Sequence, residues 1–256
     1  STLSPSSAAS DVYKRQPMNE STMKDAKQVK MICQLSTGYD NVDIEYCKNR
    51  GIHVANARNY STAAVAQHTV ALALSVLENL PYYDNYVKSG AYASQPRFAH
   101  FKPWYELEGK TWGIAGMGNI GRRVAKAAEA LGCKVIFYAT SGHSDCRDYE
   151  RVDWDTLLAQ SDILSLHCPL SDRTFHLMNA DAFSKMKKSA VLINVARGAV
   201  VDTDALYEAL VNGEIRGAGT DVFEKEPILA DNPLATLKET GKLQLTPHMA
   251  LSLIHI

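Results

Sequence analysis

The chain has 256 residues, of which 46% are hydrophobic and 21% are charged, and its 27 lysines and arginines nearly balance its 28 aspartates and glutamates. This length and composition predict a globular protein of one large domain or two modest ones. The near-neutral charge argues against sequence-independent binding to nucleic acid. No apolar run approaches the roughly 18 residues needed to cross a bilayer, so we expect no membrane span.

The cysteines indicate a reducing compartment. There are five of them, an odd number with no C-x-x-C pair: Cys33, Cys47, Cys133, Cys146 and Cys168. This pattern argues against a disulfide framework and against a zinc ribbon. We therefore expect a cytoplasmic protein without a metal site.

The two ends of the chain are related to each other at the DNA level. Residues 251–256 can be encoded by a sequence whose reverse complement encodes residues 11–16, and the pair resembles a transposon end used in sequencing libraries. We therefore expect residues 1–16 and 251–256 to be adapter-derived and not native. The alternatives are a disordered serine-rich start and a short apolar end strand.

The first native part of the chain, residues 17–80, predicts a small α/β unit. A strand, a helix and a second strand are expected at 28–35, 43–50 and 52–54. The alanine-rich run 62–80 is apolar on more than one face, which predicts a helix packed on several sides and closed by Pro81. The segment 82–108 is expected to be a helix end and a connection between two domains.

The remaining part, residues 81–250, alternates apolar runs with helical stretches. Strands are expected at 110–115, 133–138, 162–167, 190–195, 215–222 and 242–246. Strands that alternate with helices in this way predict an α/β fold with a doubly wound parallel sheet.

A glycine-rich turn follows the first of these strands. Residues 116–121 read Gly-Met-Gly-Asn-Ile-Gly, with a strand before them and a helix after them. In this context Gly116 allows a tight turn, Gly118 lets the backbone approach a pyrophosphate, and Gly121 lets helix and strand pack closely. The helix N-terminus adds free N–H groups and a partial positive charge for the phosphates. The alternative is a glycine turn without a ligand.

The second strand of this unit ends without the usual cofactor signal. A protein that uses NAD commonly has Asp or Glu there to bind the ribose 2′-hydroxyl, and one that uses NADP has an arginine nearby. This chain has Ala139, Thr140, Ser141 and a glycine instead. The two hydroxyls could serve either cofactor, and His143 or Arg147 could reach a 2′-phosphate or be solvated loop residues.

Three further side chains each follow a predicted strand: Arg197, Glu226 and His248. They could converge, because ligands bind at the carboxyl ends of strands in an open α/β sheet. Arginine pairs with a carboxylate through a planar fork. Histidine can give a proton to a carbonyl oxygen, and a neighbouring carboxylate favours its charged form and fixes its orientation. Each residue alone is typical of an ordinary loop, but together they predict reduction of a 2-keto acid.

The order Arg, Glu, His behind a dinucleotide motif resembles the D-isomer-specific 2-hydroxyacid dehydrogenase family. The resemblance covers nearly all of 28–250 and includes STGYDNVD, VAQHT, GMGNIG, LHCPL, INVARGAVVD, GTDVFEKEP and TPHMA. It implies a Rossmann nucleotide-binding domain and a flavodoxin-like α/β substrate domain, which is truncated in this chain. It also implies a small 2-hydroxy or 2-keto acid as substrate and a homodimer that uses helix 62–80 and the segment after it.

The resemblance gives individual residues a role. His248 matches the acid/base, Glu226 its paired carboxylate and Arg197 the substrate-binding arginine. Asp221 matches the residue that holds the nicotinamide carboxamide, helped by the Ala196 carbonyl. Further cofactor positions are implied at Asn119, Ile120, Cys168, Pro169, Thr174 and Val65, and we also expect Thr140, Ser141 and Val195 to bind the cofactor. Substrate positions are implied at Thr37, Gly38 and Tyr60, although these three and Val65 could equally be ordinary structural residues.

Two departures from the family pattern stand out. Gln67 lies where many relatives have Glu, and Ala139 lies at the acidic ribose position. We expect NAD as cofactor, with NADP as the alternative. Because pieces of the substrate domain are missing, we expect that half of the protein to expose apolar surface.

Two other functions are compatible with the sequence. Dehydrogenase folds can serve as nucleotide-sensing binding modules without turnover. The retention of Arg197, Glu226 and His248 together argues against a sensor, which needs no proton donor. The second alternative is an inactive truncated fragment of an enzyme.

Overall fold

The computed structural model describes residues 17–34, 36–94, 102–237 and 241–251. Contacts within the chain divide it into two units, Ser1–Tyr60 and Ser61–Ile256. The two segments expected to be adapter-derived lie outside the described residues, apart from Leu251.

The first unit contains a β-α-β arrangement. Strands β1 (Met31–Gln34) and β2 (His53–Asn56) pair in parallel, and α3 (Ile44–Asn49) lies between them in the chain. The helix begins where the Asp43 side chain accepts a hydrogen bond from the Tyr46 N–H at 2.8 Å. A short helix, α2 (Glu20–Met23), precedes β1. The core of this unit is apolar and consists of Met23, Ile32, Val42, Cys47 and Ile52.

Helix α4 (Thr62–Leu77) belongs to the second unit by its contacts, although we expected it within the 17–80 domain. It lies against α6, β7 and β8. Its buried residues are Val65, Ala66, Thr69, Leu72, Ala73, Val76 and Leu77. The reason is the one that predicted the helix: its apolar residues cover more than one face, so the sheet and a neighbouring helix both bury it.

The segment after α4 also differs from the expectation. The helix ends at Leu77, and a second helix, α5 (Leu80–Lys88), starts with Pro81 in its first turn, where a proline removes no helical hydrogen bond. A short 3-10 turn, η1 (Tyr92–Ser94), follows. Across the described residues, no single helix is long and apolar enough to span a bilayer. Helices α4 and α5 meet that length and composition only when they are taken together, and a bend of 59° separates them.

The second unit is built on a seven-stranded parallel sheet with the order β5-β4-β3-β6-β7-β8-β9. The strands are β3 (Thr111–Ala115), β4 (Lys134–Tyr138), β5 (Glu150–Arg151), β6 (Ile163–Leu166), β7 (Val191–Asn194), β8 (Gly217–Thr220) and β9 (Leu243–Leu245). Because the order reverses between β3 and β6, the sheet is doubly wound and has its switch point there. The expected α/β class and the expected strands are confirmed, and only the two-residue edge strand β5 was not anticipated.

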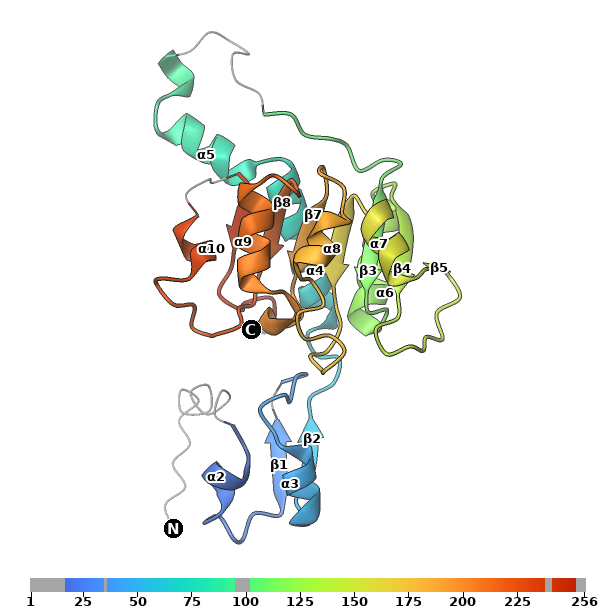
Figure 1. Cartoon of the computed structure of the whole chain (residues 1–256), viewed down its shortest axis with the longest axis vertical. Helices are drawn as coiled ribbons and strands as arrows, with labels where there is room; N and C mark the ends of the chain where they lie inside the picture. The colour runs from blue at the N-terminus through green and yellow to red at the C-terminus, as the bar shows by residue number, and fades with distance from the viewer. Residues whose placement is uncertain (1–16, 35, 95–101, 238–240, 252–256) are drawn as a thin grey trace. The chain divides into compact units, whose positions relative to one another are not determined.

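Helices cover both faces of this sheet (Figure 1). In addition to α4 they are α6 (Asn119–Ala130), α7 (Trp154–Gln160), α8 (Ala180–Ser184), α9 (Thr203–Val211) and α10 (Pro233–Thr236). Along β6, Ile163 packs in the cluster that contains residues of α4 and α6, whereas Leu164 packs with α7, α8 and α9. Successive strand residues therefore bury opposite faces, as expected for a parallel sheet covered on both sides.

Candidate active site

The glycine turn lies at the switch point of the sheet, between β3 and α6. Gly116 has a φ of +99°, and a Cβ atom there would lie 2.9 Å from the backbone nitrogen of Cys168. A Cβ at Gly121 would lie 2.3 Å from the Gly116 carbonyl oxygen, whereas one at Gly118 would have no protein atom within 4 Å. The outer two glycines are therefore required by packing. The middle one faces open space, which suits the close approach of a pyrophosphate.

Helix α6 directs its N-terminus toward this turn. Gly118 is the N-cap residue and offers no side chain to the first backbone N–H groups, and Asn119 and Ile120 occupy the first helical positions. Helix N-termini with unfilled caps bind anions through backbone N–H groups and the helix dipole. The five residues expected around the pyrophosphate thus lie together, and the turn fits a dinucleotide.

The end of β4 lies beside the glycine turn, because the Gly116 N–H donates to the Tyr138 carbonyl at 3.0 Å. The chain then makes a tight turn in which the Gly142 N–H donates to the Ala139 carbonyl at 2.8 Å. The Ser141 hydroxyl donates to the His143 carbonyl at 2.9 Å, so it is engaged within the loop. The adenosine side of the site therefore has hydroxyls and backbone groups near it but no carboxylate at the strand end.

The loop after β6 borders the other side of the turn. Burial raises the pKa of the Cys168 thiol to about 11, so the thiol stays protonated at neutral pH. The Thr174 hydroxyl donates to the Pro169 carbonyl at 2.7 Å and accepts from the Ser171 N–H at 2.8 Å. Thr174 therefore holds together the two sides of this loop, which is the loop that we expected beside the phosphates.

His167, in the same loop, was not singled out from the sequence. Its Nε2 lies 3.0 Å from the Ser165 hydroxyl, which accepts from the Trp112 indole N–H at 2.9 Å. Its Nδ1 is buried and has no hydrogen-bond partner among the residues that the structure describes. Burial lowers the pKa of His167 to about 3, so the ring is neutral at physiological pH. Only its position directly after a mostly apolar strand could have signalled this in the sequence.

The arginine loop follows β7. Asn194 fixes its backbone, since its Oδ1 accepts from the Ala196 N–H and its Nδ2 donates to the Arg197 carbonyl, both at 3.0 Å. The Arg197 guanidinium donates to the Ala196 carbonyl at 2.8 Å. That carbonyl is the one we expected to bind the nicotinamide carboxamide. Asn194 therefore positions the arginine loop, a role that was not evident from the sequence.

Close packing joins the arginine loop to the loop that carries Glu226. Gly198, the first residue of η2 (Gly198–Val200), lies so near Phe223 that a Cβ would be 1.9 Å from the Phe223 carbonyl carbon. The Phe223 N–H in turn donates to Glu226 Oε1 at 3.0 Å. Glycine is thus required at position 198 for the two loops to meet.

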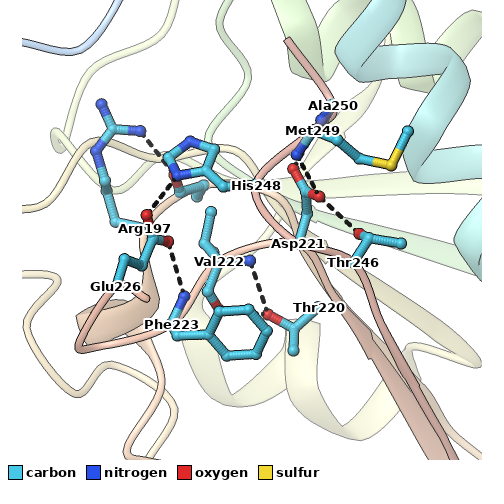
Figure 2. A network of polar contacts seen from close by, with 11 residues as sticks. Arg197, Thr220, Asp221, Val222, Phe223, Glu226, Thr246, His248, Met249 and Ala250 are labelled. Carbon is cyan, nitrogen blue, oxygen red and sulfur yellow. Dashed lines mark hydrogen bonds and ion pairs between the residues drawn. The ribbon is translucent and has the colours of Figure 1, made fainter. Parts of the chain in front are cut away.

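Glu226 and His248 form a direct pair, with Glu226 Oε2 2.7 Å from His248 Nδ1 (Figure 2). Because a carboxylate only accepts hydrogen bonds, Nδ1 carries the hydrogen and Nε2 is the nitrogen available for proton exchange. Both side chains are partly exposed, 20% for Glu226 and 28% for His248, so substrate-sized molecules can reach them. His248 has a φ of +52°, an uncommon conformation for a residue other than glycine. The three residues expected to be catalytic therefore come from three loops joined by direct contacts.

Asp221 holds the loop before and after His248 (Figure 2). Its Oδ1 accepts from the Thr246 hydroxyl at 2.6 Å and the Met249 N–H at 2.8 Å, and its Oδ2 accepts from the Ala250 N–H at 2.9 Å. Burial raises the pKa of this carboxyl, but hydrogen bonds from His68, Thr246 and the two amides outweigh burial and lower the pKa below its ordinary value. The carboxylate is 1% exposed. In this structure it organises the histidine loop, and its contact with the nicotinamide carboxamide stays a prediction.

His68 is a third residue that was not singled out from the sequence. It lies on α4, and its Nε2 is 3.0 Å from the Thr246 hydroxyl and 3.6 Å from Asp221 Oδ1. Because that hydroxyl already donates to Asp221, it accepts from His68. Val65, Val195 and Ala250 are all buried in the apolar cluster on this side of the sheet, so the two expected cofactor-lining valines belong to the same part of the core.

The expected substrate residues lie in the first unit. The Thr37 hydroxyl donates to the Ala57 carbonyl at 3.2 Å, and the Thr37 carbonyl accepts from the Asn56 side chain at 2.7 Å. The Gly38 carbonyl accepts from the Ser36 hydroxyl at 2.8 Å, and Tyr60 is exposed. Within the described ranges of both units, no group of three or more His, Cys, Asp or Glu side chains is arranged to hold a metal ion.

The sheet is doubly wound and has a dinucleotide turn at its switch point. An arginine and a histidine–carboxylate pair lie at its carboxyl edge. Together these features are typical of the active site of a nicotinamide-dependent oxidoreductase. Residues 70–250 match the family model described as D-isomer specific 2-hydroxyacid dehydrogenase, NAD binding domain. A glyoxylate reductase of Thermococcus litoralis is 40% identical over 237 residues, which are 91% of this chain and 70% of that protein. The chain belongs to the D-isomer specific 2-hydroxyacid dehydrogenase family, which links it to NAD(P)-dependent hydride transfer between 2-hydroxy acids and 2-keto acids.

Two solved structures show the same fold with different dinucleotides. A D-lactate dehydrogenase of Aquifex aeolicus, in complex with NAD and lactic acid, has a TM-score of 0.83 and 35% identity, and the match covers 93% of this chain and 74% of that one. An NADPH-dependent glyoxylate/hydroxypyruvate reductase of Sinorhizobium meliloti, in complex with NADP and malonate, has a TM-score of 0.82 and 31% identity, with 91% and 71% covered. These matches support the Rossmann fold and NAD(P) as the class of cofactor.

Proposed function

We propose that this protein transfers hydride between a nicotinamide cofactor and a small D-2-hydroxy or 2-keto acid, with His248 as the acid/base. The observation that carries the proposal is the 2.7 Å pair between His248 Nδ1 and Glu226 Oε2 beside the Arg197 loop. A nucleotide-sensing module would use the turn at 116–121 but would have no use for a histidine held ready to exchange a proton.

Each of the three residues has a distinct task in the proposed reaction. Gly116, Gly118 and the start of α6 would hold the cofactor, which would supply hydride for the carbonyl carbon of a keto acid. His248 delivers a proton from Nε2 to the carbonyl oxygen, and in the reverse direction it accepts that proton. Glu226 keeps the ring oriented and stabilises the imidazolium, which carries a positive charge. Arg197 binds the substrate carboxylate through its guanidinium fork.

The proposal is tested with two variants of the histidine–carboxylate pair and one control variant. We expect Glu226→Gln to lower turnover of 2-keto acids, because the ring loses its charged partner, and His248→Ala to lower it by about 100- to 10,000-fold, the usual contribution of a general acid. Glu224→Gln is the matched control, since Glu224 accepts from the Thr203 N–H at 2.9 Å and faces His176 instead of His248.

The measurements are NAD(P)H consumption across a panel of 2-keto acids and cofactor binding by isothermal titration. Loss of turnover with retained cofactor binding in the His248 variant supports the assignment. A His248→Ala variant that turns over within about threefold of the unchanged protein would refute it. An unchanged protein that binds the dinucleotide but reduces no 2-keto acid would support the sensor function instead.

We also propose that the chain pairs with a second copy of itself through the segment after α4. Helix α5 has no buried residue, and Leu80, Val87 and Tyr92 are exposed along it and just after it. Exposed apolar surface of this kind marks interaction sites. Light scattering after size-exclusion chromatography should give the mass of a dimer, and replacing Val87 with Glu should shift it to that of the monomer.

A further inference from the structure

The ribose end of the dinucleotide site has an unusual charge distribution for a protein of this fold. The turn after β4, residues 139–142, lies where an acidic side chain would bind a ribose 2′-hydroxyl. Ala139 is buried, and no carboxylate extends from this turn. A 2′-phosphate at this place would therefore meet no like charge from the strand end.

An arginine reaches this turn from a different loop. Arg173 lies in the loop after β6, and its Nη1 is 3.9 Å from the position that a Cβ of Gly142 would occupy. The loop is fixed by the buried Thr174, whose hydroxyl bonds to Pro169 and Ser171 as described above. Arg173 itself is exposed, and no residue within the described ranges forms a hydrogen bond or ion pair with its guanidinium.

Two other arginines around the turn are engaged elsewhere, whereas Arg147 of the adjoining segment is exposed. Arg151 donates to the Gly142 carbonyl at 2.8 Å, so it faces the backbone of the turn. Arg122, in the first turns of α6, forms an ion pair with Asp145 that neutralises both side chains. Of the two arginines whose guanidinium groups are placed beside Gly142, Arg151 and Arg173, Arg173 is thus the one whose five N–H donors are not committed to another described residue.

We propose that Arg173 binds the 2′-phosphate of the adenosine ribose, so that the protein prefers NADP(H) to NAD(H). Arginine is suited to this contact because its planar fork donates two parallel hydrogen bonds to phosphate oxygens. Thr140 belongs to the same turn, and its hydroxyl can donate a further hydrogen bond to a phosphate. The proposal rests on the dinucleotide site of the proposed function. It adds that the residue that selects between NAD and NADP comes from the loop after β6, and not from the end of β4.

The test uses ligands without a nicotinamide, so it does not depend on turnover. Adenosine 2′,5′-bisphosphate and adenosine 5′-monophosphate are titrated calorimetrically into the full 256-residue chain. We expect the bisphosphate to bind about tenfold more tightly or better, which corresponds to one charge-assisted arginine–phosphate contact. Arg173→Ala should reduce this preference to below about threefold. Arg147→Ala, which removes an exposed arginine of the neighbouring segment, should retain it.

Two results would overturn the proposal. One is equal binding of the two nucleotides by the unchanged protein, and the other is a preference that survives in Arg173→Ala or disappears only in Arg147→Ala. Because Arg173 is exposed and unpaired, its replacement should leave the urea unfolding midpoint unchanged, which separates a lost contact from a lost fold. A protein that shows the preference but reduces no 2-keto acid would support this inference while refuting the proposed function.

Discussion

The buried histidine at the end of β6 predicts a specific sensitivity to acid. The pKa of His167 falls from its ordinary 6.5 to about 3 because the ring is buried. Between these two values the unfolded chain binds a proton at this side chain and the folded chain does not. Stability from this group is therefore lost as pH falls below 6.5, and the loss continues until the folded protein also takes up the proton near pH 3.

The size of the effect follows from the width of that interval. Each unit of pH below the ordinary value costs about 1.4 kcal/mol for one proton. At pH 4.5 the folded protein should thus have lost about 2 to 3 kcal/mol through His167 alone. His167→Gln keeps a group that can bond to the Ser165 hydroxyl but cannot titrate. The acid-dependent part of its unfolding free energy should therefore be smaller by that amount.

The assay is urea unfolding at pH 7 and at pH 4.5, followed by tryptophan fluorescence. All three tryptophans, Trp104, Trp112 and Trp154, belong to the second unit, so the signal reports on the sheet that contains His167. The exposed His53→Gln serves as control and should retain the acid-dependent loss of the unchanged protein. If His167→Gln loses as much free energy between the two pH values as the unchanged protein does, the reasoning about the buried neutral ring is refuted.

Four further changes have defined outcomes. Gly121→Ala should cost about 1 to 3 kcal/mol in urea unfolding, because its Cβ would overlap the Gly116 carbonyl. Gly118→Ala should leave the unfolding midpoint nearly unchanged and weaken dinucleotide binding in a titration, because only a ligand would meet the added methyl group. Asp221→Asn should lower the free energy of unfolding by about 1.5 to 3 kcal/mol at neutral pH. The stabilisation by Asp221 should disappear as pH falls through its lowered pKa. In acid, the unfolding free energies of the variant and the unchanged protein should therefore become equal. Tyr105→Phe should cost about 1 kcal/mol, since its hydroxyl donates to the Ser189 carbonyl at 2.9 Å.

Much of the fold could be predicted because local patterns and the final structure agree. The apolar runs that indicated strands, such as Ile163–Leu166, are buried on both faces of the parallel sheet. The boundary at α4 could not be predicted, because the sequence shows that a helix is apolar on several faces but not which domain covers them. The strand Glu150–Arg151 could not be predicted either, since two polar residues carry no period and pair only because β4 presents an open edge.

The sequence could indicate which residues belong to the candidate site, but not the contacts that hold them together. The position of Arg197, Glu226 and His248 after strands indicated where each would lie, because strand ends share one edge of a parallel sheet. The contacts that hold them at that edge are tertiary. A sequence without coordinates does not reveal that Gly198 must touch Phe223, or that the Asp221 carboxylate turns toward the backbone of the histidine loop.

The position of His248, the proposed proton donor, is therefore set by two carboxylates, those of Asp221 and Glu226. His248 has a left-handed backbone conformation between Pro247 and Met249, and such strain persists only where the surroundings fix it. Asp221 supplies that constraint by binding the loop on both sides of the histidine, and Glu226 fixes the ring itself. The first contact determines where the ring lies and the second determines which nitrogen faces the substrate. A change at Asp221 should thus lower kcat by displacing the ring, and a change at Glu226 should lower kcat by freeing the ring to rotate.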